Sequence, residues 1–216
     1  MDYSSRQFQA FPPVVKNIII INVLMYLGTE ALTRIGSPIP QYLVLWFFGS
    51  DRFMIHQLVT HMFMHANFIH LFFNMFMFYM FGRALENVWG SKRFLIYYFV
   101  TGLGAALLHQ GVIYFQYHDY IIQLSGQLNL SVLGASGAVY GVLLAFGMLF
   151  PNTVLMLLFP PIPIKAKWMV VILGAVALFL GLTQPGSNIA HFAHLGGMIF
   201  GYLLIKYWQR NRKNFY

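Results

Sequence analysis

The sequence predicts an all-α membrane protein, a bundle of six transmembrane helices. Of the 216 residues, 59% are hydrophobic, 18% are aromatic and only 8% are charged, whereas an ordinary soluble domain has about 25% charged residues. The mean hydropathy is +0.66. A soluble fold of this size could not cover its surface with so few charged side chains. The composition also excludes a disordered chain, a coiled coil and collagen, and the absence of cysteine excludes a disulfide scaffold.

Six apolar runs are long enough to be transmembrane helices, since a crossing needs about 20 mostly apolar residues. They cover residues 17–35, 67–85, 94–115, 132–150, 167–183 and 189–207. We therefore expect a short cytoplasmic segment at 1–16, one six-helix domain at 17–208 and a basic cytoplasmic tail at 209–216. The first run has no small-residue cleavage pattern behind it, so it reads as a retained helix.

Basic residues predict the orientation of the bundle. With six helices, both termini lie on one side of the membrane, and of the 13 Lys and Arg residues only Arg34 and Arg52 fall on the other side. Positive residues favour the cytoplasmic face, so we expect cytoplasmic termini in a cell (plasma or inner) membrane. The net charge of +8 forms no long run, which argues against a nucleic-acid partner.

The first external loop, residues 36–66, is unusually apolar. It carries Tyr42, Trp46, Phe47, Phe48 and Phe53. We expect it to lie half-submerged against the outer leaflet as a membrane-associated segment, rather than free in water as a disordered loop.

Polar side chains within the apolar runs are functional candidates, because they are costly in lipid. They are His70, Asn74, Ser136, His191 and His194, with His109 as a lone case in the third run. The second, fourth and sixth helices all run inward, and the first five of these residues fall in their first turns. At a rise of about 1.5 Å per residue, the polar residues of these three helices share one depth, roughly 5–10 Å below the outer surface.

Ser136 lies between Gly134 and Gly137, and glycines there permit a tight turn and a close approach of a neighbouring helix. At a helix N-terminus, free N–H groups and the positive dipole end also suit an oxyanion. The alternative for this motif is helix packing by small residues. His194 shares a helix face with Gly197 and Gly201, which could bring it to Ser136 as a Ser–His pair.

His70 and Asn74 lie one turn apart on one helix face, and both can donate hydrogen bonds. They could form an oxyanion hole with the Ser136 N–H, or they could be interhelical polar contacts. His191 is expected to line the site.

Two further interpretations concern metals and acids. His61 and His65 have the i, i+4 spacing of metal ligands, but no Cys or carboxylate accompanies them, so we expect no metal and no other cofactor. No acid has a motif that would complete a Ser–His triad, so a hydrolase here must use a dyad. The five acids are Asp2, Glu30, Asp51, Glu86 and Asp119.

The motifs Gly134-Ala135-Ser136-Gly137, Ala193-His194-Leu195-Gly196-Gly197 and His70-x-x-x-Asn74 resemble those of the rhomboid intramembrane serine proteases, over roughly residues 15–208. The resemblance implies Ser136 as nucleophile, His194 as general base, His70 and Asn74 as oxyanion-hole donors, and Tyr140 as the residue that packs on the histidine. It implies a rhomboid-like bundle, single-pass membrane proteins as substrates and membrane lipid as surroundings. The oligomeric state is not predicted.

The sequence departs from the family at one place. Many members have Trp-Arg or Trp-Gln before the Thr60-His61 stretch, where this chain has His56-Gln57, and this change puts the anchoring of the first loop in question. Two alternatives to the protease remain: a catalytically silent binding protein of the same fold, and a small transporter. A transporter should carry polar residues through the full membrane thickness, whereas those here stop in the outer half.

Overall fold

The computed structural model describes residues 8–117, 130–156, 161–184 and 190–210. Two of the acids and three of the basic residues counted above lie outside this description: Asp2, Asp119, Arg6, Arg212 and Lys213. The tail beyond Arg210 also lies outside it.

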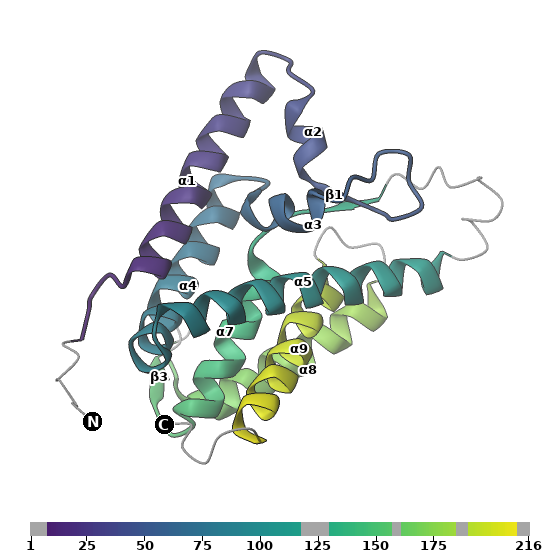
Figure 1. Ribbon diagram of the computed structural model, residues 1–216. Coiled ribbons are helices and arrows are strands. Elements are labelled where there is room, and N and C mark those ends of the chain that lie inside the picture. The colour runs from purple at the N-terminus through teal and green to yellow at the C-terminus, as the bar shows by residue number, and fades with distance from the viewer. Residues whose placement is uncertain (1–7, 118–129, 157–160, 185–189, 211–216) are drawn as a thin grey trace.

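Six helices of 14 or more residues form the described bundle, and each overlaps one of the six apolar runs (Figure 1). They are α1 (Pro13–Arg34), α4 (Phe68–Trp89), α5 (Ser91–Gln116), α7 (Ser136–Leu149), α8 (Ala166–Thr183) and α9 (His191–Arg210). By length and hydropathy, α1, α4, α5 and α8 can each cross a membrane. α7 is apolar but short, and α9 has 20 residues with two histidines in its first turn.

Two helices begin four residues away from the position that the hydropathy predicts. α1 begins at Pro13, inside the segment assigned to the cytoplasm, because proline fits the first helical position and its missing N–H is not needed there. α7 begins at Ser136 instead of residue 132. Ser131 and Val132 pair with another strand, and Gly134 has φ +123°, which no helix accommodates.

The chain is mostly helical rather than entirely so: one short strand pair joins two loops, and another lies within the segment between α7 and α8. The first loop contains α2 (Ile39–Leu43), β1 (Leu45–Trp46), α3 (Gln57–Thr60) and the 3-10 turn η1 (His61–Phe63). β1 pairs antiparallel with β2 (Ser131–Val132), and β3 (Val154–Met156) pairs with β4 (Pro163–Lys165). Backbone N–H and C=O groups outside helices need hydrogen-bond partners, and these strand pairs supply some of them.

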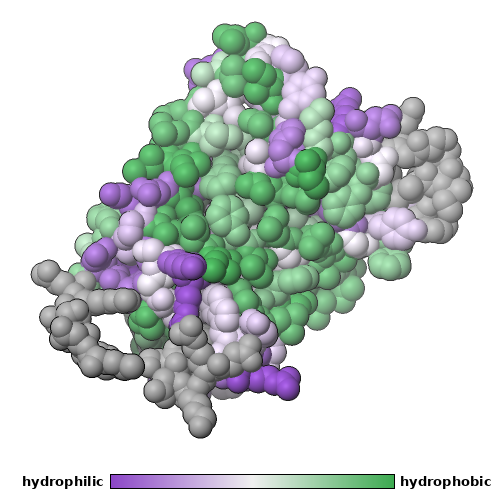
Figure 2. Space-filling model, viewed as in Figure 1, coloured by the Kyte–Doolittle hydropathy of each residue, from purple (hydrophilic) through white to green (hydrophobic). Residues whose placement is uncertain are grey.

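α7 lies in the middle of the bundle and contacts α4, α5, α8 and α9. Aromatic rings fill the space around it: Phe78 of α4 and Phe94, Tyr97 and Tyr98 of α5 are fully buried. The outer faces are apolar too, as at Leu24 of α1 (62% exposed). Hydrophobic residues cover the middle of the visible face in Figure 2, and hydrophilic residues gather toward its margins. Such a surface is typical of a protein that faces lipid.

Glu86 ties the start of α1 to the end of α4. Its buried carboxylate accepts hydrogen bonds from the N–H groups of Val14 (2.9 Å) and Val15 (2.8 Å) and from the hydroxyl of Ser91 (2.7 Å). These amides belong to the first turn of α1, where no helical carbonyl can accept from them and where a negative charge is favoured. The carboxylate therefore caps a helix other than its own.

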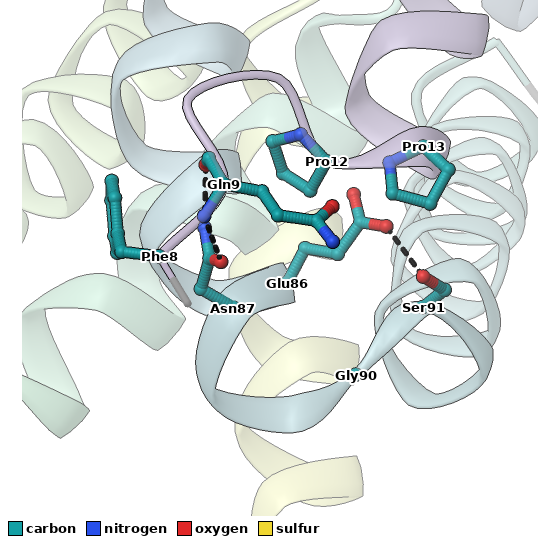
Figure 3. A pocket seen from close by; sticks show the side chains of 8 residues that line it. All are labelled: Phe8, Gln9, Pro12, Pro13, Glu86, Asn87, Gly90 and Ser91. Carbon is teal, nitrogen blue, oxygen red and sulfur yellow. Dashed lines mark hydrogen bonds between the residues drawn. The ribbon is translucent and has the colours of Figure 1, made fainter. Parts of the chain in front are cut away.

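An open pocket of about 480 Å³ lies over this junction, between Phe8, Pro12, Pro13 and Asn87 (Figure 3). Gln9 and Asn87 close one side of it by exchanging hydrogen bonds of 2.9 and 3.0 Å. None of the residues that line the pocket is a candidate site residue. The hollow is thus a feature of the α1–α4 junction.

Removing the Glu86 carboxylate should destabilise the fold. Glu86→Ala leaves the buried N–H of Val15 and the partly buried N–H of Val14 and hydroxyl of Ser91 without their acceptor. We expect the free energy of unfolding to fall by about 2–3 kcal/mol, the upper part of the range for unsatisfied buried donors. Thermal or denaturant unfolding in detergent measures this. The control is Glu30→Ala, because Glu30 makes only a surface ion pair with Arg34 at 3.8 Å, which is worth about 0–1 kcal/mol. Equal losses in both variants would contradict the capping role.

Candidate active site

Ser136 is the first residue of α7, and the backbone before it is sharply bent. Gly134 has a positive φ of +123°, a conformation that side chains rarely allow. Its N–H donates to the carbonyl of His61 at 2.9 Å, which fixes the bend against η1. The hydroxyl of Ser136 is thereby presented at the start of a helix, beside N–H groups that the helix itself does not use.

His194 lies in the first turn of α9, and its Nε2 is 2.9 Å from Oγ of Ser136. The two residues come from helices 58 positions apart in sequence. The bond can form because α9 and α7 touch through glycines. A Cβ at Gly197 would overlap the carbonyl oxygen of Gly137, and a Cβ at Gly137 would overlap the side chain of Ala105 on α5. Glycine at these positions sets the distance between serine and histidine.

Tyr140 holds the histidine ring in plane. Its ring stacks on that of His194 with centroids 4.1 Å apart and an interplanar angle of 5°. His191 approaches the same imidazole edge-on, with centroids at 6.3 Å and 85°. His194 is 8% exposed, and among the described residues its orientation is constrained by packing rather than by a carboxylate.

His70 lies next to the bend before Ser136. A Cβ at Gly134 would be 2.9 Å from Cε1 of His70 and 3.8 Å from Oγ of Ser136. The ring of His70 therefore needs glycine at position 134. Gly134, which falls within the predicted fourth helix, lies ahead of α7 and contacts His70 of α4.

Asn74 is buried one turn below His70, at 7% exposed. Its Nδ2 donates to the carbonyl of His70 at 2.8 Å, a bond within α4 that the sequence does not predict. A carboxamide nitrogen has two hydrogens, so one donor remains. Among the described residues, neither His70 nor Asn74 hydrogen-bonds Ser136. The ring of His70 lies near the serine across Gly134, and Asn74 is attached to the backbone of His70.

Gly201, which is expected on the same helix face as Gly197, contacts a different helix from Gly197. A Cβ there would overlap the hydroxyl of Tyr97 on α5. α9 is therefore packed closely against α7 at one glycine and against α5 at the other.

His61 and His65, whose spacing is that of metal ligands, lie in different surroundings. Nδ1 of His61 lies 2.7 Å from the carbonyl of Gln57, whereas both ring nitrogens of His65 are buried beside the ring of His70 with no hydrogen-bond partner among the described residues. Burial lowers the pKa of His61 and of His65 to about 4 each, so both are neutral at pH 7. In the part of the chain that the structure describes, no three His, Cys, Asp or Glu side chains gather as a metal site.

The first loop is anchored although His56-Gln57 replaces the common Trp-Arg or Trp-Gln. His56 Nε2 lies 2.9 Å from the Tyr42 carbonyl. Gln57 accepts from the Trp46 N–H at 3.2 Å and donates to the Arg52 carbonyl at 2.9 Å. The substitution that put the anchoring in question therefore leaves the loop tied at several points.

The sequence did not single out Gln110 of α5, which contacts the first loop. It is 1% exposed and bonds the backbone of the first loop. The signal that could have found it was a lone carboxamide in an apolar helix. Its neighbour His109 has a buried Nδ1 to which no described residue hydrogen-bonds.

Comparisons with known proteins agree with this architecture. The Rhomboid domain family model matches residues 52–211. The chain is 32% identical over 168 residues to "RHOMBOID-like protein 12, mitochondrial" of Arabidopsis thaliana and 31% over 150 residues to "Putative rhomboid protease YdcA" of Bacillus subtilis (strain 168). It is 27% identical over 147 residues to "Rhomboid protease AarA" of Providencia stuartii.

These alignments cover most of this chain but only part of each relative. They include 74%, 68% and 66% of this chain, and 47%, 64% and 52% of the three relatives in the same order. The chain thus spans about half to two thirds of the length of these proteins.

A methyl group at Gly197 should separate α9 from α7. Because it would overlap backbone rather than a flexible side chain, we expect Gly197→Ala to lower the free energy of unfolding by about 3 kcal/mol, the upper part of the range for overpacking. The matched control is Gly28→Ala in α1, where nothing lies within 4 Å of the added Cβ. Alanine favours a helix over glycine by about 1 kcal/mol, so this control should be neutral or stabilising. Unfolding in detergent compares the two, and a similar response from both variants would contradict the contact.

Proposed function

Because the chain belongs to the rhomboid family of membrane proteins, we propose that it is an intramembrane serine endopeptidase. It would hydrolyse peptide bonds in or near the transmembrane segments of single-pass membrane proteins. The observation that carries this proposal is the 2.9 Å contact between Ser136 Oγ and His194 Nε2, made by residues of α7 and α9. A hydroxyl bonded to an oriented imidazole is the arrangement of an activated nucleophile.

In the proposed reaction, His194 takes the proton of Ser136 as Oγ attacks the substrate carbonyl carbon. The tetrahedral intermediate forms with its negative oxygen near the Ser136 N–H and the donors of His70 and Asn74. The protonated His194 then gives its proton to the leaving amine. A water molecule, deprotonated by the same imidazole, hydrolyses the acyl-enzyme and restores the serine.

The stack of Tyr140 on His194 does part of what an aspartate does in a triad. In a triad, the acid holds the imidazole in a productive orientation and stabilises its charged form. The parallel ring at 4.1 Å restricts the rotation of the imidazole, and the face of an aromatic ring attracts a cation. A dyad supported in this way needs no metal or other cofactor.

The length of α7 supports a site below the membrane surface. Its 14 residues span about 21 Å at 1.5 Å per residue, which is short of the roughly 30 Å of a hydrocarbon core. If its end at Leu149 lies at the cytoplasmic boundary, Ser136 lies roughly 9 Å below the outer boundary. This depth suits cleavage of a segment that enters from the outer face.

The proposal includes the topology. We assign six spans by adding α7 and α9 to the four helices that meet the length and hydropathy of a crossing. The termini are then cytoplasmic, and the site opens to the outer face of a plasma or inner membrane. The first loop would rest on the outer leaflet, which is supported by its exposed apolar side chains Ile39, Tyr42, Phe48 and Ile55.

The nucleophile and the base should be indispensable. Ser136→Ala and His194→Ala should each abolish cleavage of a model single-pass substrate in liposomes, and the double variant should be no worse, because residues that act as a unit are non-additive. Ser37→Ala, in the first loop beyond α1, is the control and should cleave normally. A chelator such as EDTA should have no effect. Turnover by Ser136→Ala, or activity lost to EDTA and restored by zinc, would contradict the mechanism.

Asn74 should matter for chemistry more than for stability. We expect folded Asn74→Ala to lose roughly 10²–10³-fold in kcat, the scale for one oxyanion donor, with little change in KM because the oxyanion forms only after attack. Asn22 of α1 offers a matched control, since its Nδ2 also donates to the carbonyl four residues earlier, at 2.7 Å. Asn22→Ala should keep its kcat. A normal kcat with a lower Tm in Asn74→Ala would assign Asn74 to the scaffold.

A further inference from the structure

The strand β1 of the first loop has an inner edge that is paired with a strand and an outer edge that is not. Its inner edge meets β2, with Trp46 opposite Ser131, and Figure 1 shows the pair lying beside α5. The N–H of the next residue, Phe47, donates to the carbonyl of Leu130 at 3.0 Å. Since hydrogen-bonded and non-hydrogen-bonded pairs alternate along an antiparallel ladder, Trp46 and Ser131 form a non-hydrogen-bonded pair. The N–H and C=O of Trp46 therefore point away from β2.

Two glutamine side chains satisfy this outer edge. Gln57 accepts from the N–H of Trp46 at 3.2 Å. Gln110 of α5 donates from Nε2 to the carbonyl of Trp46 at 3.1 Å and accepts at Oε1 from the N–H of Phe48 at 3.2 Å. In a parallel ladder, the N–H and C=O of a single residue on the adjacent strand would bond the same two positions, the C=O of one residue and the N–H of the second residue after it. The carboxamide of Gln110 thus takes the place of a third strand.

Apolar packing reinforces this connection. Phe47 (3% exposed) packs against Ile113 of α5, one turn after Gln110, with Leu130 beside them. Gln110 is itself 1% exposed. A glutamine buried this deeply on an otherwise apolar helix is costly unless both ends of its amide are bonded, and here both are.

The same ladder leads to the proposed nucleophile. Residues 130–132 are held by β1, and Gly134 is held by the carbonyl of His61. Only Ala135 separates that bond from Ser136. The position of the serine and of its N–H therefore depends on a chain of backbone bonds that begins at the carboxamide of Gln110.

We infer that Gln110 is a positioning residue for peptide-bond cleavage: by bonding residues 46 and 48 it fixes the β1–β2 pair, and through it the bend that presents Ser136. This inference rests on the proposed protease function. Gln110 does not touch the reacting atoms, and it acts through the first loop and the segment before α7.

The test replaces Gln110 with methionine, which is similar in length and lacks the amide. Per folded enzyme, we expect kcat on a model single-pass substrate to fall about 10–100-fold with KM nearly unchanged, because a displacement of about 1 Å at the reacting atoms has an effect of this order. The rate at which a small fluorophosphonate labels Ser136 should fall by a similar factor. A merely structural residue would lower the Tm and leave both rates per folded molecule unchanged. Asn22→Leu, which removes an equally buried carboxamide from α1, is the control for an effect on stability alone.

A disulfide across the strand pair provides a rescue. The chain has no cysteine, so Trp46→Cys with Ser131→Cys introduces a single possible bridge. The Cα atoms of a non-hydrogen-bonded pair are about 4.5 Å apart, which lies within the disulfide range of about 4.4–6.8 Å. Oxidation should restore most of the rate to Gln110→Met and change little when Gln110 is present. If Gln110→Met does not fold, Gln110→Asn, whose shorter side chain cannot reach both backbone groups, must show the same split between kcat and KM.

The outcomes separate this inference from the protease proposal. An unmodified protein that neither cleaves nor is labelled at Ser136 refutes the proposed function. An active unmodified protein beside an equally active Gln110→Met refutes the positioning role alone. A loss of rate that persists after the double-cysteine variant is oxidised also refutes the positioning role, since the effect would not pass through the strand pair.

Discussion

The contact between Gly197 of α9 and Gly137 of α7 is the constraint on which the candidate site depends. There is no room for a side chain between the two helices at this level, and the absence of side chains lets a hydroxyl on one helix bond an imidazole on the other. In a bilayer, apolar burial does not drive helices together as it does in water, so close van der Waals packing has to hold them. The same glycines therefore determine both the stability of the helix pair and the geometry of Ser136 and His194.

Three buried polar side chains of this bundle are paired across elements. Lipid offers no hydrogen bonds to a free backbone group. Glu86 accepts from the first turn of α1, and Gln57 and Gln110 satisfy the outer edge of β1. These three side chains attach α1, whose surface mostly faces lipid, and the first loop. Hydrophobic packing fixes these two parts of the chain least. Catalytic geometry in such a protein would depend on polar groups well outside the reacting atoms.

The helices were predictable because hydropathy alone marks them, whereas their ends were not. α1 begins at Pro13, four residues before the apolar run, because proline fits the first helical position and the distant Glu86 carboxylate accepts from the next two N–H groups. α7 loses its first residues to pairing with a strand of the first loop, and two-residue strands carry no periodic signal. Contacts between distant segments decide both boundaries, and a single sequence does not show them.

The candidate site was also predictable only in part. Small residues around Ser136 and His194 at one depth predict that they meet, and their hydroxyl and imidazole do lie in contact. The bond of Asn74 to the His70 carbonyl and the role of Gln110 in the first loop depend on side-chain orientation, which spacing does not determine. The functional roles of Ser136, His194, His70, Asn74 and Tyr140 remain predictions that rest on motif and geometry together.

The most direct measurement of the central claim, a serine activated by the histidine of a second helix, is to locate the residue that reacts with an electrophile. The purified protein is treated with a fluorophosphonate, and the adduct is mapped by mass spectrometry, with His194→Ala treated in parallel. The account predicts a single adduct on Ser136 that His194→Ala forms far more slowly. An adduct on another residue, or equal labelling of Ser136 in both proteins, would contradict it.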